Sequence, residues 1–134
     1  MKDFMELGQR ILQAQPFSRL LGTGLEHLAA GEAVLTLPVR EDFLQQHGYV
    51  HGGVVSYLAD NALTFAGGAE FGDAVTVEYK INYVRPAKAQ RLRAEAKTAA
   101  AGKRLATCQC EIWAETEGDE PYICAVAQGT IMAK

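Results

Sequence analysis

Long apolar runs are missing from this sequence. No apolar stretch reaches the ~18–20 residues that a membrane-spanning helix needs. The N-terminal segment MKDFMELGQRIL is acidic and amphipathic, so it lacks the basic-then-apolar order of a secretory signal. With 134 residues, 49% hydrophobic and 22% charged, the chain has the profile of one globular domain over 1–134. We therefore expect a cytoplasmic protein that is not inserted in a membrane.

Cysteine and histidine are scarce, with three of each. An odd number of cysteines argues against a closed disulfide framework, and Cys108 and Cys110 alternate in a strand-like segment, as small buried thiols do. His47 and His51 are four residues apart, but the glycines around them disfavour a helix there. No Glu or further His completes a ligand set nearby. We expect no metal site and no redox chemistry.

Acidic residues are nearly absent from 85–104, where Glu95 is the only one. This stretch holds seven basic residues: Arg85, Lys88, Arg91, Arg93, Lys97, Lys103 and Arg104. It carries +6, and the other 114 residues carry −9, because the whole chain carries −3. A solvated hairpin surface would explain most of these charges. The alternative is a patch that binds a small polyanion, whereas nucleic acid fits poorly because the chain as a whole is acidic.

Hydrophobic spacing predicts three helical segments and two short strands in the first half of the chain and only strands in the second. Apolar residues at helical intervals predict three segments: 2–14, a short turn over 17–21, and 53–66, which Gly67-Gly68 would end. Two short strands turn at Ala30-Gly31, and alternation predicts four longer ones: 75–83, 91–99, 105–115 and 122–132. In the first of these, apolar residues take the odd positions, so Thr76 falls on the other face.

The order of these elements predicts the fold class. A helix that is apolar on every side, as 53–66 nearly is, must be covered on every side. A strongly curved antiparallel sheet of five or six strands wrapped around that helix is the most economical cover. This is the α+β hotdog fold.

Asp60 is unusual within this helix, because it lies in mid-helix with no positive charge among its near neighbours. Burying an ionised carboxylate alone costs several kcal/mol unless it is paired or hydrogen-bonded. Asp60 could lie on a narrow exposed stripe with Ser56 and Thr64, or it could be a hydrogen-bonded core residue. A catalytic carboxylate is the third possibility.

The start of the same helix favours the catalytic interpretation. Gly52 and Gly53 lie where its first N–H groups have no helical partner and carry the positive end of the dipole, so a carbonyl oxygen that becomes negative could approach there. Gly52 and Asp60 are eight residues apart, or roughly 12 Å at ~1.5 Å per residue, which is too far for one carbonyl to touch both. If they serve one reaction, they come from different chains of a two-fold dimer.

Residues 45–63, with VTVEYKINYVRPAK (75–88) and GKRLA (102–106), resemble the hotdog-fold acyl-CoA thioesterases of the phenylacetate-degradation type. The most specific feature of this resemblance is a side-chain amide followed by Gly48 and then by the sequence HGG (51–53). An acidic residue, Asp60, lies nine residues after His51. The resemblance implies that Asp60 is the catalytic base or nucleophile and that the Gly52 N–H binds the oxyanion. It further implies that His51 orients that turn, that Thr76 holds the attacking water, and that Gln45 or its neighbour Gln46 contacts the thioester. A homotetramer of two dimers is also implied.

The substrate would then be an acyl- or aryl-CoA, with coenzyme A part of the substrate and no separate cofactor. For the CoA phosphates the candidates are Arg85, Lys88, Lys103 and Arg104. For the acyl pocket they are Tyr57, Leu63 and Phe17. A hotdog-fold hydratase, a non-catalytic acyl-CoA or acyl-carrier binding module, and a structural dimerising domain stay open as alternatives, and the sequence does not identify the acyl group.

Overall fold

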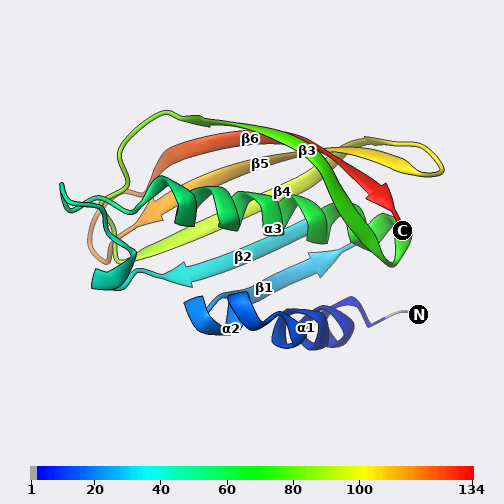
Figure 1. Ribbon diagram of the computed structural model, residues 1–134, viewed down its shortest axis with the longest axis horizontal. Coiled ribbons are helices and arrows are strands. Elements are labelled where there is room, and N and C mark those ends of the chain that lie inside the picture. Colours follow the sequence, from blue (N-terminus) through cyan, green and yellow to red (C-terminus); the bar gives the residue numbers. More distant parts are fainter. Residues whose placement is uncertain (1–2) are drawn as a thin grey trace.

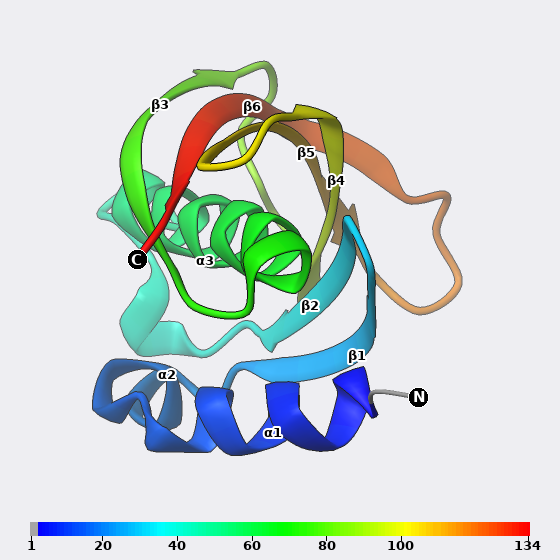
Figure 2. The same ribbon diagram turned by 90° about the vertical axis from the view of Figure 1, so that its right-hand side faces the viewer.

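A computed structural model describes residues 3–134, which form one curved antiparallel sheet and three α-helices. In chain order the elements are α1 (Phe4–Ala14), α2 (Pro16–Leu21), β1 (Gly24–Ala29), β2 (Glu32–Pro38), the 3₁₀ turn η1 (Glu41–Phe43), α3 (Gly52–Phe71), β3 (Ala74–Tyr83), β4 (Arg91–Ala101), β5 (Leu105–Glu115) and β6 (Tyr122–Ala133). The strand order is β1-β2-β4-β5-β6-β3. Figure 1 shows the sheet behind α3, and Figure 2 shows it curling around that helix. The expected hotdog architecture is confirmed.

The core lies between the inner face of the sheet and α3. Leu58, Ala62 and Leu63 of α3 are fully buried, as are Leu35 and Ile112 of the sheet. Burying a large aliphatic side chain stabilises a protein by roughly 1.5–3 kcal/mol, so this layer dominates the stability of the fold. All three cysteines are free and buried, as expected. None of the helices described is long and apolar enough to cross a membrane.

Helix α3 differs from the expectation in one respect that matters for the site. It is not apolar on every side, because a partly exposed polar stripe runs along it: Ser56, Tyr57, Asp60, Asn61 and Thr64. Strand β3 borders this stripe at Ser56, Asp60 and Thr64, and the α1–α2 segment borders it at Tyr57 and Asn61, so the stripe is only partly covered. Asp60 thus shares a helix face with Ser56 and Thr64, as the first alternative described, but it is half-buried and hydrogen-bonded there.

The same helix also continues past Gly67-Gly68 and ends at Phe71, where Gly72 adopts a φ of 97°. Gly67 does not end the helix but lets α3 pack closely on β6, because a Cβ at this position would lie 2.6 Å from the Cβ of Ile131. The predicted end was wrong because glycine has two uses in helices, and the sequence alone does not separate them.

Strand β3 contains a bulge that changes which side chains face α3. Its register against β6 shifts between Thr76 and Glu78. Such a shift leaves an extra residue unpaired and re-aims the side chains beside it. As a result Thr76 points toward α3 together with Tyr79, while Val75 and Val77 are exposed. The strict alternation expected over 75–83 was therefore wrong at its start.

Candidate active site

Three side chains of β3 hydrogen-bond to α3 at intervals of one helical turn. The Tyr83 hydroxyl donates to the Gly52 carbonyl oxygen at 3.0 Å, and the Tyr79 hydroxyl lies 2.6 Å from the Ser56 hydroxyl. The third contact is from the Thr76 hydroxyl to Asp60 Oδ1 at 2.7 Å. Strand β3 thus fixes both the start of α3 and its mid-helix carboxylate.

Asp60 is held by hydroxyl groups and not by a cation. Besides the bond from Thr76, the Thr64 hydroxyl donates to the Asp60 carbonyl oxygen at 2.8 Å and lies 2.7 Å from the Thr76 hydroxyl. Within residues 3–134 Asp60 Oδ2 has no hydrogen-bond partner. A half-buried carboxylate with one oxygen anchored and one oxygen free is suited to accept a proton from water or to attack a carbonyl carbon.

The start of α3 presents one free backbone N–H group. His51 caps the helix, because its Nδ1 accepts from the Gly53 N–H at 2.8 Å and its carbonyl oxygen accepts from the Val54 N–H at 2.9 Å. The Gly52 N–H between them donates to no group in the described part of the chain. The His51 ring therefore orders this turn and leaves a dipole-polarised donor open to a ligand.

Gln45 and Gln46 lie in the loop before α3. The Gln45 side-chain oxygen accepts from the His47 N–H at 2.6 Å, so it stabilises its own loop, which turns at Gly48 with a φ of 85°. Gln46 is exposed. The Gln45 NH₂ group and the exposed Gln46 amide both remain available to a substrate oxygen, so the choice between them stays open.

Cysteine chemistry does not compete with Asp60 for the role of nucleophile. Burial raises the pKa of the Cys124 thiol to about 11 and also raises the pKa of Cys110. Neither forms an appreciable thiolate at neutral pH, and the thiolate is the nucleophilic form.

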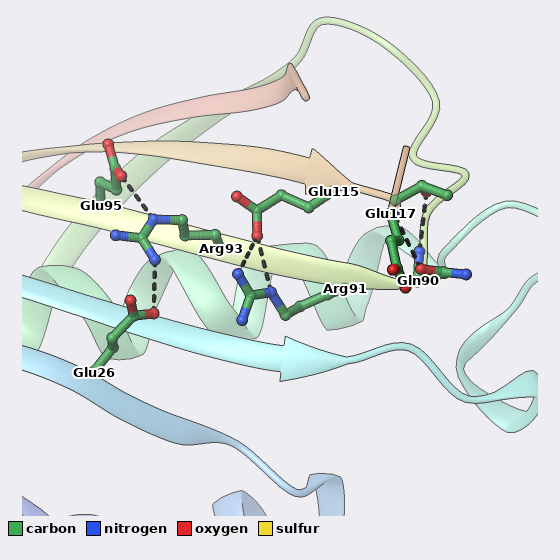
Figure 3. Close-up of polar contacts among 8 residues, drawn as sticks. Glu26, Gln90, Arg91, Arg93, Glu95, Glu115 and Glu117 are labelled. Carbon is green, nitrogen blue, oxygen red and sulfur yellow. Dashed lines mark hydrogen bonds and ion pairs between the residues drawn. The ribbon is translucent and has the colours of Figure 1, made fainter. Parts of the chain in front are cut away.

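The basic stretch 85–104 is divided by its contacts. Figure 3 shows Arg93 bridging Glu26 and Glu95 on the outer face of the sheet, and Arg91 paired with Glu115. These arginines belong to the ion-paired surface that the solvated alternative described. Arg85 is set apart, because its guanidinium carbon lies 4.0 Å above the Tyr122 ring.

The four candidate phosphate ligands do not lie together in one chain. Arg85 and Lys88 are in the loop between β3 and β4, whereas Lys103 and Arg104 are in the turn between β4 and β5. Strand β4, with 11 residues, separates the two pairs by roughly 35 Å at ~3.3 Å per residue. Figure 1 shows these two loops at opposite ends of the molecule.

The three residues predicted for the acyl pocket have different environments. Leu63 is fully buried, and a Cβ at Gly129 of β6 would lie 3.3 Å from its Cδ1, so it belongs to the core. Phe17 and Tyr57 pack edge to face at 5.1 Å between their ring centroids. The Tyr57 hydroxyl lies 2.6 Å from the Ser18 hydroxyl, which ties α2 to α3.

Sequence reasoning missed Thr64 and Tyr83 as parts of the site. In the sequence Thr64 is a stripe neighbour of Asp60, and its i+4 spacing places it beside the carboxylate. Tyr83 occupies an odd, apolar position of 75–83, and only the structure brings its hydroxyl to Gly52.

Comparison with known proteins shows what this arrangement is similar to. The model of the thioesterase superfamily matches residues 47–120. A solved thioesterase family protein from Silicibacter pomeroyi is 27% identical, with a TM-score of 0.91 and coverage of 96% of both chains. A mutant of the phenylacetic acid degradation protein PaaI from Thermus thermophilus is 36% identical, with a TM-score of 0.79 and coverage of 90% of this chain and 100% of that one. A Saccharolobus solfataricus protein with a provisional esterase name is 30% identical over 132 residues, which cover 97% of this chain and 85% of that one.

Proposed function

Because the chain belongs to the thioesterase superfamily and is a thioester hydrolase, we propose that it cleaves acyl- or aryl-CoA to the free acid and coenzyme A. The observation that carries the proposal is the pair of unused groups on α3. Asp60 Oδ2 is free to accept a proton, and the Gly52 N–H is free to donate a hydrogen bond. Thioester hydrolysis needs both a base or nucleophile and an oxyanion donor.

Asp60 acts as general base in the reaction that we propose. A water molecule bound near Thr76 loses a proton to Asp60 while its oxygen bonds to the thioester carbon. The carbonyl oxygen becomes an oxyanion that accepts a hydrogen bond from the Gly52 N–H, with the Gln45 NH₂ group as a second donor. Collapse of this intermediate breaks the C–S bond and returns the proton to the CoA sulfur. Direct attack by Asp60 would give an anhydride that water then hydrolyses.

A two-fold dimer supplies Asp60 and Gly52 from different chains. Strand β3 is an edge of the sheet with Val75 and Val77 exposed, and an unpaired edge of this kind favours pairing with a second copy. Antiparallel pairing of β3 with the partner's β3 would set the two α3 helices side by side in opposite directions. Each Asp60 would then approach the partner's helix start, which overcomes the separation of roughly 12 Å within one chain. A homotetramer of such dimers and a cytoplasmic location complete the proposal.

The same two-fold axis would bring the two pairs of candidate phosphate ligands, which lie far apart within one chain, close together across the dimer. The end of one protomer that carries Arg85 and Lys88 would lie near the end of its partner that carries Lys103 and Arg104. Together they would offer positive charge to the pyrophosphate and 3′-phosphate of coenzyme A.

The test is thiol release from a panel of acyl-CoAs by the native protein and by Asp60→Asn, with Asp119→Asn in an exposed turn as the matched control. We expect Asp60→Asn to lose about 100-fold or more in kcat, which is the scale of a positioned acid-base group, and Asp119→Asn to keep native activity. Circular dichroism would check that both variants fold.

Other outcomes of the panel would favour the alternatives. Tight binding of acyl-CoA without turnover would identify a binding module, and addition of water to an enoyl-CoA would identify a hydratase. Native turnover that survives in Asp60→Asn would remove Asp60 from the reaction.

A further inference from the structure

A cavity of about 200 Å³ lies between α1 and α3, separate from the hollow of about 630 Å³ on the outer face of the sheet. Its walls are mainly apolar: Phe4, Leu7 and Ile11 from α1, and Phe65, Gly68 and Ala69 from α3. Leu7 and Ile11 are each about 40% exposed, which is unusual for aliphatic residues on the face of a helix that looks toward the protein. We call this cavity the α1–α3 pocket.

The α1–α3 pocket reaches the candidate active site through Thr64. Thr64 lines the pocket, and its hydroxyl lies 2.7 Å from the Thr76 hydroxyl and 3.5 Å from Asp60 Oδ1. Asn61, which follows Asp60, also lines the pocket and donates to the Gln15 side-chain oxygen at 3.1 Å. A group attached to a carbonyl carbon at Asp60 therefore has an apolar space beside it.

Resting on the thioester hydrolysis proposed above, we infer that the α1–α3 pocket binds the acyl group and sets its size. An apolar protein cavity of about 150 Å³ holds one benzene ring, so about 200 Å³ suits one ring or a short to medium chain. Asp73 is the only charged residue among the described residues that line the pocket, and it disfavours acyl groups with a terminal carboxylate. The preferred substrates are uncharged acyl groups of this size, and long chains are rejected.

Gly68 gives a direct way to fill the pocket. A Cβ at Gly68 would meet only the Cβ of Ala74 at 3.9 Å, an ordinary contact, so a larger side chain can extend into the cavity. We expect Gly68→Leu to lower kcat/KM for phenylacetyl-CoA and hexanoyl-CoA by about 10-fold or more, and for acetyl-CoA by less than about 3-fold.

Substitutions at Leu7 and Ile11 would enlarge the pocket. They should affect folding little, because both side chains are partly exposed. The double variant Leu7→Ala/Ile11→Ala enlarges the pocket, and we expect its kcat/KM for dodecanoyl-CoA to rise about 5-fold or more relative to that for hexanoyl-CoA. Leu20→Ala, which removes an exposed leucine on α2 outside the pocket, is the matched control and should keep the native acyl preference.

The measurement is kcat/KM over acetyl-, hexanoyl-, phenylacetyl-, dodecanoyl- and glutaryl-CoA for native protein and the three variants. Opposite shifts in the filled and enlarged variants support the inference. It is overturned if native protein prefers dodecanoyl- or glutaryl-CoA, or if neither pocket variant changes the acyl preference. If native protein hydrolyses none of the five, the proposed function is wrong. If it hydrolyses some of them but the pocket variants do not change the acyl preference, only the inference about the pocket is wrong.

Discussion

Among residues 3–134, the Thr76 hydroxyl makes the one hydrogen bond to Asp60 Oδ1 that comes from outside α3. Replacing Thr76 with Val keeps the shape of the side chain and removes that hydrogen bond. A hydrogen bond to a charged group is worth about 1.5–3 kcal/mol, so we expect kcat for a good acyl-CoA substrate to fall about 10- to 100-fold. KM should change by less than about 2-fold, because the role proposed for Thr76 is to position Asp60 and the attacking water and not to bind coenzyme A.

Thr76→Ser is the control for this prediction, since it restores the hydroxyl without the methyl group. Steady-state kinetics on both variants should show kcat largely recovered in the serine variant. Equal loss in Val and Ser variants would point to packing at this position, not to the hydrogen bond.

The contact between Glu26 and Arg93 predicts a small pH-dependent contribution to stability. The hydrogen bond from Arg93 lowers the pKa of Glu26 below its ordinary value of 4.5. The stabilisation is present above pH 4.5 and is lost as the pH falls through the lowered pKa of the folded state. Because Glu26 is about half exposed, we expect Glu26→Gln to reduce the free energy of unfolding at pH 7 by less than about 1 kcal/mol.

Urea denaturation at pH 7 and in acid would measure this effect, with Glu120→Gln, in the exposed turn before β6, as the control. A native-minus-variant difference that persists unchanged in acid would contradict the role assigned to the Arg93 contact.

The site residues that could be predicted from the residues alone are those marked by spacing within one element. Asp60 and Gly52 could be identified because a carboxylate in an apolar helix and a glycine pair at the helix start are both visible within α3. Thr76 was reached only through resemblance, because strict alternation placed it on the wrong face and the bulge that re-aims it leaves no local signal.

At the scale of elements, the neighbouring glycines of α3 have opposite roles. Gly67 packs so closely on β6 that an added Cβ would lie 2.6 Å from two atoms of Ile131, whereas at Gly68 the nearest atom is 3.9 Å away. We expect Gly67→Ala to lower the free energy of unfolding by about 1–3 kcal/mol through overpacking. Gly68→Ala should raise it by about 0.5–1 kcal/mol, because alanine favours the helix.

Guanidinium denaturation of the two variants tests this prediction, each serving as the control for the other. Similar changes in both would mean that helix propensity, not the contact with Ile131, governs this part of α3.

The types and order of the α-helices and strands were predictable from periodicity and turn residues, whereas the 3₁₀ turn η1 lies in a segment that the sequence does not distinguish from a loop. The predictions that failed depend on tertiary contacts: α3 passes Gly67 because β6 packs too closely for a side chain there, and β3 departs from alternation at a bulge between Thr76 and Glu78. The i, i+4 series Ser56, Asp60 and Thr64 indicated the polar stripe on α3, but its contacts with β3 depend on tertiary packing and could not be predicted from the helix alone.

At the scale of the whole molecule, the two-chain site that we propose predicts complementation between two inactive variants. Gly52→Pro removes the proposed oxyanion donor at a position where proline fits: it is the first residue of α3, and His51 before it has an extended ψ of 135°. We expect this variant to lose about 10²- to 10³-fold in kcat. Mixed dimers of Gly52→Pro and Asp60→Asn should recover about half of the native activity, because one of their two sites then holds both native groups.

Differently tagged copies, co-expressed and purified through both tags, would provide these mixed dimers, with each parent homodimer as a control. Activity no higher than that of the parents would contradict a site that draws on two chains, since within one chain every site would carry one defect.

The position of β3 in the sheet also determines when, during synthesis, this strand can pair with its neighbour. In the described part of the chain β3 pairs with one strand, β6, which begins at Tyr122, 39 residues after β3 ends at Tyr83. At ~5–20 residues per second, a ribosome needs about 2–10 s to produce the missing neighbour. During that interval the strand that carries Thr76 and Tyr83 has no ladder to hold it against α3. The emerging chain therefore completes the contacts of β3 with Asp60 and Gly52, and the β3 edge proposed to pair with a second copy, only after β6 has left the ribosome.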